Sequence, residues 1–184
     1  MILAHQSCAG QLNVPDIFTR LLLSLLATGL APRSFYRASD GARPHYDGLP
    51  VDYVASAIAG LGAATTSGFH TYNAVNPHDD GVSLDSFVDW LIDAGYPIER
   101  IEDFDLWVSR FETAMRALPD EQRRNSVLMV MDAFREPIDA VPGSLVPSDR
   151  FQQATNDVLG QKIPHITATL IEKYAADLSA LKLL

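Results

Sequence analysis

A strand-like run that passes through a polar loop into a capped amphipathic helix restricts the fold of this chain more than any other feature. The run covers residues 69–75, the loop covers 76–81, and a helix is expected from Ser83 to Gly95. Serine is a favoured N-cap, apolar residues follow it at helical spacing, and glycine often ends a helix in the left-handed conformation. In α/β proteins the loop after a strand is where ligands bind. The unit therefore predicts a candidate site with the polar residues Asn73, Asn76, His78, Asp79 and Asp80.

Length and charge exclude several classes of protein. The chain has 184 residues, of which 47% are hydrophobic, enough to build one domain or one lobe of a larger domain. Its formal net charge of −9 argues against a nucleic-acid partner and against an anionic membrane surface. The extended apolar run at residues 21–26, which Ser24 interrupts, is far shorter than the roughly 20 residues that a membrane span needs. Cys8 is the only cysteine, so no internal disulfide forms, and with no signal peptide recognisable we expect a cytoplasmic protein.

The order of the remaining elements predicts a mostly helical chain with a few short strands. Residues 1–4 resemble the end of a buried strand, residues 32–49 predict a long ordered loop or short hairpin, and residues 98–101 predict a short edge strand. Capping residues and apolar periodicity predict the helices. These are expected near residues 15–28, 53–61, 83–95, 104–118, 120–134, 149 onward and 167–181.

The motifs of a complete dinucleotide-dependent reductase are not found in the sequence. A phosphate-binding turn needs glycines between a strand and a helix, whereas the Gly60-Leu-Gly62 stretch follows a predicted helix and is better explained as a helix end. A catalytic tyrosine of the short-chain reductases needs a lysine four residues later, and no tyrosine here has one. His78, Asp79 and Asp80 are adjacent and favour turn chemistry over a metal site. Cys8 has no activating neighbour in sequence and is expected to be a buried or half-buried thiol.

A polar segment directly follows the predicted strand end at residues 1–4. It contains Gln6, Ser7, Gln11 and Asn13 and precedes the first helix. These side chains are suited to hydrogen-bonding an amide-bearing ligand. Helix capping and satisfaction of loop backbone groups explain them equally well.

With these segments in order, the chain resembles the C-terminal part of the thioester reductase domain of actinobacterial carboxylic acid reductases. The 76–81 segment, Asn-Pro-His-Asp-Asp-Gly, and the residues that follow it to Asp85 carry the most specific part of the resemblance. Pro50-Val-Asp52 resembles a motif of the extended short-chain dehydrogenases. Further matching segments are residues 1–4, 9–16, 31–36, 45–52, 143–147 and 149–151.

The resemblance implies an α/β fold: the mostly helical C-terminal substrate-binding lobe of a Rossmann-like, extended short-chain dehydrogenase domain. It implies that residues 1–184 form one partial domain, with the nucleotide-binding half upstream of Met1, in cis or in trans. In the family, NADPH reduces an acyl thioester held on the phosphopantetheine arm of an acyl carrier domain and releases an aldehyde. The Gly-rich loop and the Tyr-Lys pair belong to the upstream half, so the resemblance assigns no catalytic residue and no metal ligand to this chain.

The functions that the resemblance assigns to this chain are a strand end on the nicotinamide side and a channel for the acyl group or the pantetheine arm. The candidates for the strand end are Ile2, Leu3, Ala4 and His5. The candidates for substrate binding are Gln11, Asn13, Phe35 and Tyr46. The alternative hypothesis is a non-catalytic product of a truncated or split gene, either an acyl-carrier binding module or a protein with no activity.

Overall fold

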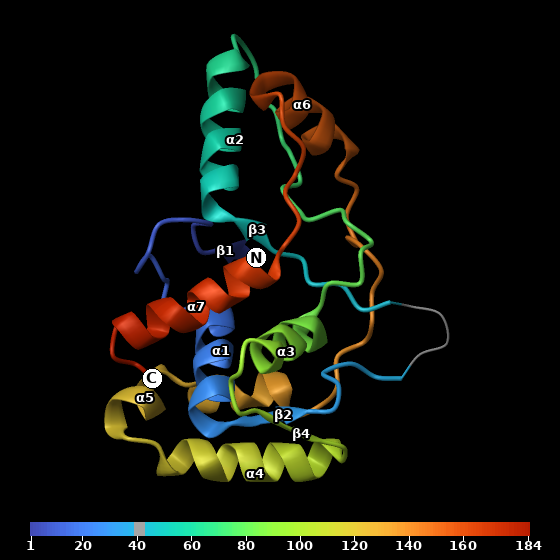
Figure 1. Ribbon diagram of the computed structural model, residues 1–184. Coiled ribbons are helices and arrows are strands. Elements are labelled where there is room, and N and C mark those ends of the chain that lie inside the picture. The colour runs from blue at the N-terminus through green and yellow to red at the C-terminus, as the bar shows by residue number, and fades with distance from the viewer. Residues whose placement is uncertain (39–42) are drawn as a thin grey trace.

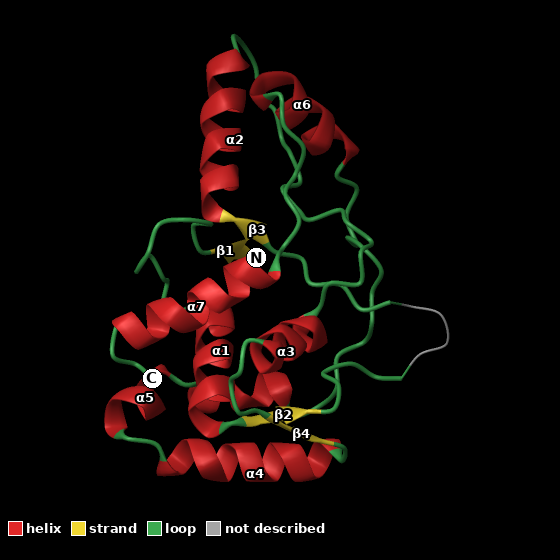
Figure 2. Cartoon of the chain, viewed as in Figure 1, coloured by secondary structure: helices red, strands yellow, loops and turns green. Residues whose placement is uncertain are grey.

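The computed structural model describes residues 1–38 and 43–184, so residues 39–42 of the predicted 32–49 loop lie outside the described residues. Seven α-helices, one 3-10 helix and four short strands make up the described part (Figures 1 and 2). The helices are α1 (Ile17–Thr28), α2 (Val51–Ala64), α3 (Leu84–Asp93), α4 (Phe104–Ala117), α5 (Asp120–Asn125), η1 (Val127–Phe134), α6 (Asp149–Leu159) and α7 (Ala168–Ala180). The strands are β1 (Ile2–Leu3), β2 (Leu30–Pro32), β3 (Leu49–Pro50) and β4 (Glu99–Ile101).

The four strands form two separate parallel pairs. β1 pairs with β3, with Ile2 opposite Leu49, and β2 pairs with β4, with Ala31 opposite Arg100. The edge strand expected at residues 98–101 is confirmed as β4. The strand expected at residues 69–75 is wrong, because no described strand lies beside this segment and Phe69 is fully exposed.

Capping explains most of the helix boundaries. The Asp16 carboxylate accepts hydrogen bonds from the backbone N–H groups of Phe18 and Thr19, and Ser83, Asp103 and Thr167 cap α3, α4 and α7. The single helix expected over residues 120–134 is wrong, because Ser126 is extended and separates α5 from η1. The buried hydroxyl of Ser24 in α1 accepts a hydrogen bond from the backbone N–H of Val127. This bond fixes the start of η1, directly after the break, against α1.

Two hydrophobic clusters stabilise the fold. The larger one packs α1, α3, α4 and α7 around fully buried aromatic side chains such as Phe18, Phe87 and Trp107. The smaller one lies between α2 and α6, which stand together at the top of Figure 1, and includes Tyr53, Val54 and Phe151. The molecule thus has a main helical body and a smaller helical pair that projects from it.

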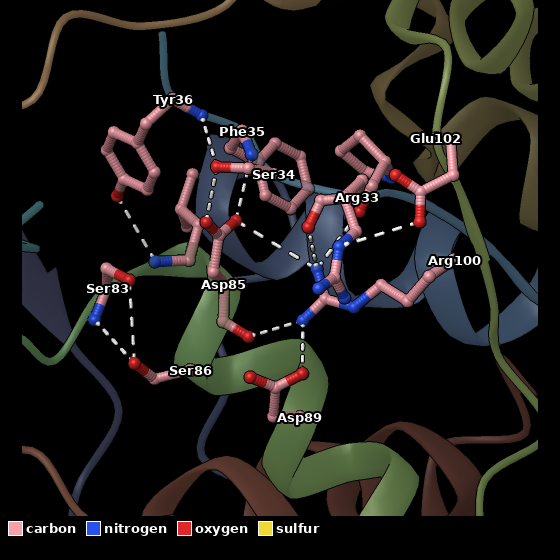
Figure 3. A network of polar contacts seen from close by, with 12 residues as sticks. Arg33, Ser34, Phe35, Tyr36, Ser83, Asp85, Ser86, Asp89, Arg100 and Glu102 are labelled. Atoms are coloured by element: carbon pink, nitrogen blue, oxygen red, sulfur yellow. Dashed lines mark hydrogen bonds and ion pairs between the residues drawn. The ribbon is translucent and has the colours of Figure 1, made fainter. Parts of the chain in front are cut away.

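A polar network ties α3 to both strands of the second pair (Figure 3). Arg100 of β4 is largely buried and donates from Nη2 to the backbone oxygen of Asp85, at 2.7 Å, and to Asp89, at 2.6 Å. Asp85 in turn accepts the backbone N–H of Phe35 at 2.8 Å. The network fixes the chain where it leaves β2 and begins the long loop.

Gly29 ends α1 under a tight steric constraint. Its φ is +66°, and a Cβ atom there would lie 2.8 Å from the backbone oxygen of Pro97. We expect Gly29→Ala to lower the free energy of unfolding by more than the about 1–2 kcal/mol that a left-handed conformation alone costs. Gly95→Ala is the matched control, because Gly95 also has a positive φ, +93°, but open space at the Cβ position. Urea denaturation that gave equal losses for the two variants would contradict the steric account.

Candidate functional site

A cavity of about 430 Å³ opens where β1 meets the loop before α1. Ile2, Leu3 and Ala4 line it from the strand end, and Gln11 and Asn13 line it from the loop. Leu12 of the same loop also lines it, and the other walls come from the start of α1, the start of α2 and the middle of α7, through Asp16, Thr19, Val51 and Tyr174. We call this cavity the β1 pocket. It brings together five of the eight residues that the sequence analysis assigned to cofactor or substrate.

Helix α7 holds the backbone around the β1 pocket in place. The buried hydroxyl of Tyr174 accepts the backbone N–H of Ala4 at 2.6 Å, and the buried carboxylate of Asp177 accepts the backbone N–H of Gly10 at 2.8 Å. Burial raises the pKa of the Tyr174 phenol well above its ordinary value, against the opposing effect of the Ala4 hydrogen bond. The phenol therefore stays protonated, and no described residue accepts its O–H hydrogen.

The side chains of Gln11 and Asn13 make no hydrogen bond to any other described residue. Both are exposed, and both line the β1 pocket. The neighbouring Gln6 differs, because its amide donates to Asp52 at 2.8 Å. Gln6 is thus used within the fold through its contacts with Asp52, while Gln11 and Asn13 keep their amides available to a ligand.

His5 and Cys8 have local roles beside the pocket rather than in its lining. The Nδ1 atom of His5 accepts the backbone N–H groups of Ser7 and Cys8, each at 3.1 Å, and shapes the turn that follows β1. Cys8 itself is exposed, so the expectation of a buried or half-buried thiol is wrong. The reason is that the loop at residues 5–10 projects from the surface instead of packing against the core.

The structure places Phe35 and Tyr46 in the main hydrophobic core instead of in the β1 pocket. Phe35 is 2% exposed and packs edge-on against Trp107 with ring centroids 5.6 Å apart. Tyr46 is half-buried between Phe18 and Phe87, and burial raises the pKa of its phenol. Neither ring lines the β1 pocket.

The polar residues of the 73–80 segment mostly stabilise the fold. Asn76 is buried, its backbone N–H donates to Asp47 and its side chain donates to the Gly48 oxygen. His78 hydrogen-bonds the Ile163 oxygen and stacks on His165, which pairs with Asp80 at 2.7 Å. His78 also lines a polar cleft beside α6 with Asp149 and Lys162. Within the described ranges, no group of three His, Cys, Asp or Glu side chains is placed to hold a metal ion.

The comparisons with known proteins agree with this architecture, although no family model matches the chain. A carboxylic acid reductase of Mycobacterium marinum is 55% identical over 190 residues, which cover all of this chain and 16% of that protein. The crystal structure of the reductase domain of a nonribosomal peptide synthetase from Mycobacterium tuberculosis superposes with a TM-score of 0.91 at 49% identity, covering all of this chain and 45% of that one. The terminal reductase domain of the myxalamid pathway superposes with a TM-score of 0.72 at 26% identity.

The fold is therefore that of the C-terminal lobe of a reductase domain of the extended short-chain dehydrogenase type. In sequence, the chain matches the C-terminal part of the thioester reductase domain of actinobacterial carboxylic acid reductases over its whole length. It spans less than half of the reductase domain that it superposes on, and about a sixth of the M. marinum relative. In the part of the chain that the structure describes, no helix is long and apolar enough to cross a membrane.

Proposed function

We propose that this chain forms the substrate side of an NADPH-dependent thioester reductase, which releases a carrier-bound acyl group as an aldehyde. The observation that carries the proposal is the β1 pocket, in which two side-chain amides and a neutral phenol converge at a strand end. Small-molecule sites combine an apolar wall with a few convergent polar groups in this way. The similarity to reductase domains supplies the reaction class.

The pocket residues suit one end of the cofactor. The strand end Ile2–Ala4 and the neighbouring apolar side chains are proposed to provide a partly buried wall for the nicotinamide, which supplies hydride to the thioester carbonyl. The chain does not offer the Gly-rich turn between strand and helix that would hold the pyrophosphate. We therefore propose that residues 1–184 are one partial domain, and that a nucleotide-binding half upstream, in cis or in trans, binds most of the NADPH.

Gln11 and Asn13 are proposed to bind the phosphopantetheine arm. That arm contains two amide groups, and side-chain amides both donate to and accept from an amide. The acyl carrier domain that bears the arm is the proposed partner, and the proposed location is the cytoplasm. Relatives several times longer than this chain support a carrier domain in the same polypeptide.

We expect the isolated 184-residue chain not to oxidise NADPH in the presence of an acyl-pantetheine thioester. The reason is that the proton donor and the phosphate-binding loop belong to the other half. Absorbance at the reduced-nicotinamide band measures turnover directly. Adding the N-terminal half of the M. marinum reductase domain, fused or in trans, is expected to restore aldehyde release.

Two results separate this proposal from the non-catalytic alternative. Turnover by the isolated chain would contradict the proposal that the upstream half supplies the phosphate-binding loop and the proton donor. A fusion that binds NADPH, yet neither binds nor reduces the thioester, would favour a chain that has lost its catalytic role.

A further inference from the structure

A second, apolar groove lies between α2 and the 68–74 segment, with Phe151 of α6 in its lining, on the projecting helical pair at the top of Figure 1. Its volume is about 510 Å³, within the roughly 300–1,000 Å³ range of small-molecule sites. Along α2 the lining runs from Val54 through Leu61 to Thr65, a length of about 16 Å at 1.5 Å per residue. The 68–74 segment closes the other side. The groove is therefore elongated, which suits an extended chain better than a compact ring.

The groove exposes large apolar side chains that the fold does not cover. Its floor is buried, with Ala57 1% and Phe151 3% exposed, whereas Ile58 at the rim is 68% exposed and Phe69 is fully exposed. Exposed apolar side chains around a groove of this kind mark a binding site. Burial of a hydrocarbon chain would remove this surface from water.

Arg150 adds a positive charge beside the groove, next to the lining residues His70 and Tyr72. Its guanidinium lies 5.0 Å from the centroid of the Tyr72 ring and donates to Nδ1 of His70 at 3.1 Å. His70 in turn hydrogen-bonds the Ser67 oxygen through Nε2 at 3.3 Å. No described carboxylate lies within ion-pair distance of Arg150. Tyr72 and His70 thus orient a cation whose charge the fold does not compensate.

We propose that this groove binds a straight-chain aliphatic carboxylate, with the hydrocarbon chain along α2 and the carboxylate against Arg150. A guanidinium pairs with a carboxylate through two parallel hydrogen bonds, which an alcohol or an amine does not reproduce. The chain's net charge of −9 disfavours an anionic bilayer as the source, so the ligand is a free acid from solution. The proposal is independent of the reductase function, because none of the groove residues lines the β1 pocket.

Calorimetric titration of the 184-residue chain with octanoate, nonanoate and decanoate tests this inference. Affinity is expected to rise about fourfold per added methylene, as burial of each CH₂ predicts. Decanol and decyltrimethylammonium are expected to bind more weakly than decanoate. Backbone amide shifts in nuclear magnetic resonance are expected between residues 54 and 74 and around residue 151.

Three variants locate the site. Arg150→Gln is expected to weaken decanoate binding about tenfold and to leave decanol binding unchanged, since only the charged hydrogen bonds are lost. Arg116→Gln, which removes the same charge from α4 at the other end of the molecule, is the matched control and should change neither. Gly62→Leu should weaken both ligands, because the Cβ position of Gly62 is open and the new side chain fills the groove. Equal decanoate affinity in Arg150→Gln and in Arg116→Gln, or no binding by the unmodified chain, would overturn the proposal.

Discussion

Asp177→Ala is expected to lower the free energy of unfolding by about 3 kcal/mol, the cost of leaving one partner of a buried ion pair without the other. Asp177 is 3% exposed and pairs with Lys173 one helical turn earlier, whose side chain is also largely buried. The same carboxylate accepts the backbone N–H of Gly10. The substitution therefore strands a buried charge and releases the loop that borders the β1 pocket. Urea denaturation, read as a shift in midpoint at constant slope, measures the loss.

Two controls define the cause of that loss. Glu172→Ala removes an exposed carboxylate from the same helix and is expected to change stability by no more than about 0.5 kcal/mol. Asp177→Asn keeps an acceptor for Gly10 while losing the charge, and should fall between the two. An Asp177→Ala variant as stable as Glu172→Ala would contradict the proposed anchoring of the loop by α7.

The double variant Gln11→Ala with Asn13→Ala, in a complete reductase, is expected to lower kcat/KM for the carrier-bound thioester about 100-fold. Each amide is proposed to make one hydrogen bond to the phosphopantetheine arm, worth about 1.4 kcal/mol or a factor of ten. Neither amide bonds to another described residue, so the fold should lose little stability. Steady-state kinetics with carrier-bound substrate, beside thermal unfolding of each variant, give the measurement.

Gln153→Ala is the matched control for the amide variants. Gln153 is an exposed amide on α6 that pairs with Asp157, away from the β1 pocket. Its removal is expected to leave kcat/KM unchanged. If the double variant behaved like Gln153→Ala, the substrate role of the 11–13 loop would be wrong.

Local signals in the sequence predicted the elements whose ends depend on nearby residues. Ser83 caps α3 as expected, and Asp16, Asp103 and Thr167 likewise act within a few residues as the caps of α1, α4 and α7. The strand predicted at residues 69–75 failed because strand formation needs a partner, which is a tertiary property. The break at Ser126 likewise depends on Ser24, about a hundred positions earlier.

In the candidate site, too, features set by nearby residues were predictable and features set by long-range contacts were not. Residues 2–4 and the amides of Gln11 and Asn13 were recognisable from the strand end, the polar loop and the family resemblance. Tyr174 was not, because it lies on the apolar face of the last helix and meets Ala4 across 170 positions. Phe35 was a substrate candidate from the family resemblance, yet Asp85 and Arg100 fix the start of the long loop so that the ring lies in the core. Side-chain direction after a strand depends on such long-range contacts.

The most direct test of the central claim is a titration of the isotopically labelled chain with an acyl-pantetheine thioester, followed by backbone amide resonances. If the β1 pocket is the substrate site, the largest shifts will occur at Gln11 and Asn13, and the double amide variant will no longer show saturable shifts in the 11–13 loop. Shifts confined to other parts of the chain, or no saturable shift at all, would contradict the assignment of this pocket to the thioester.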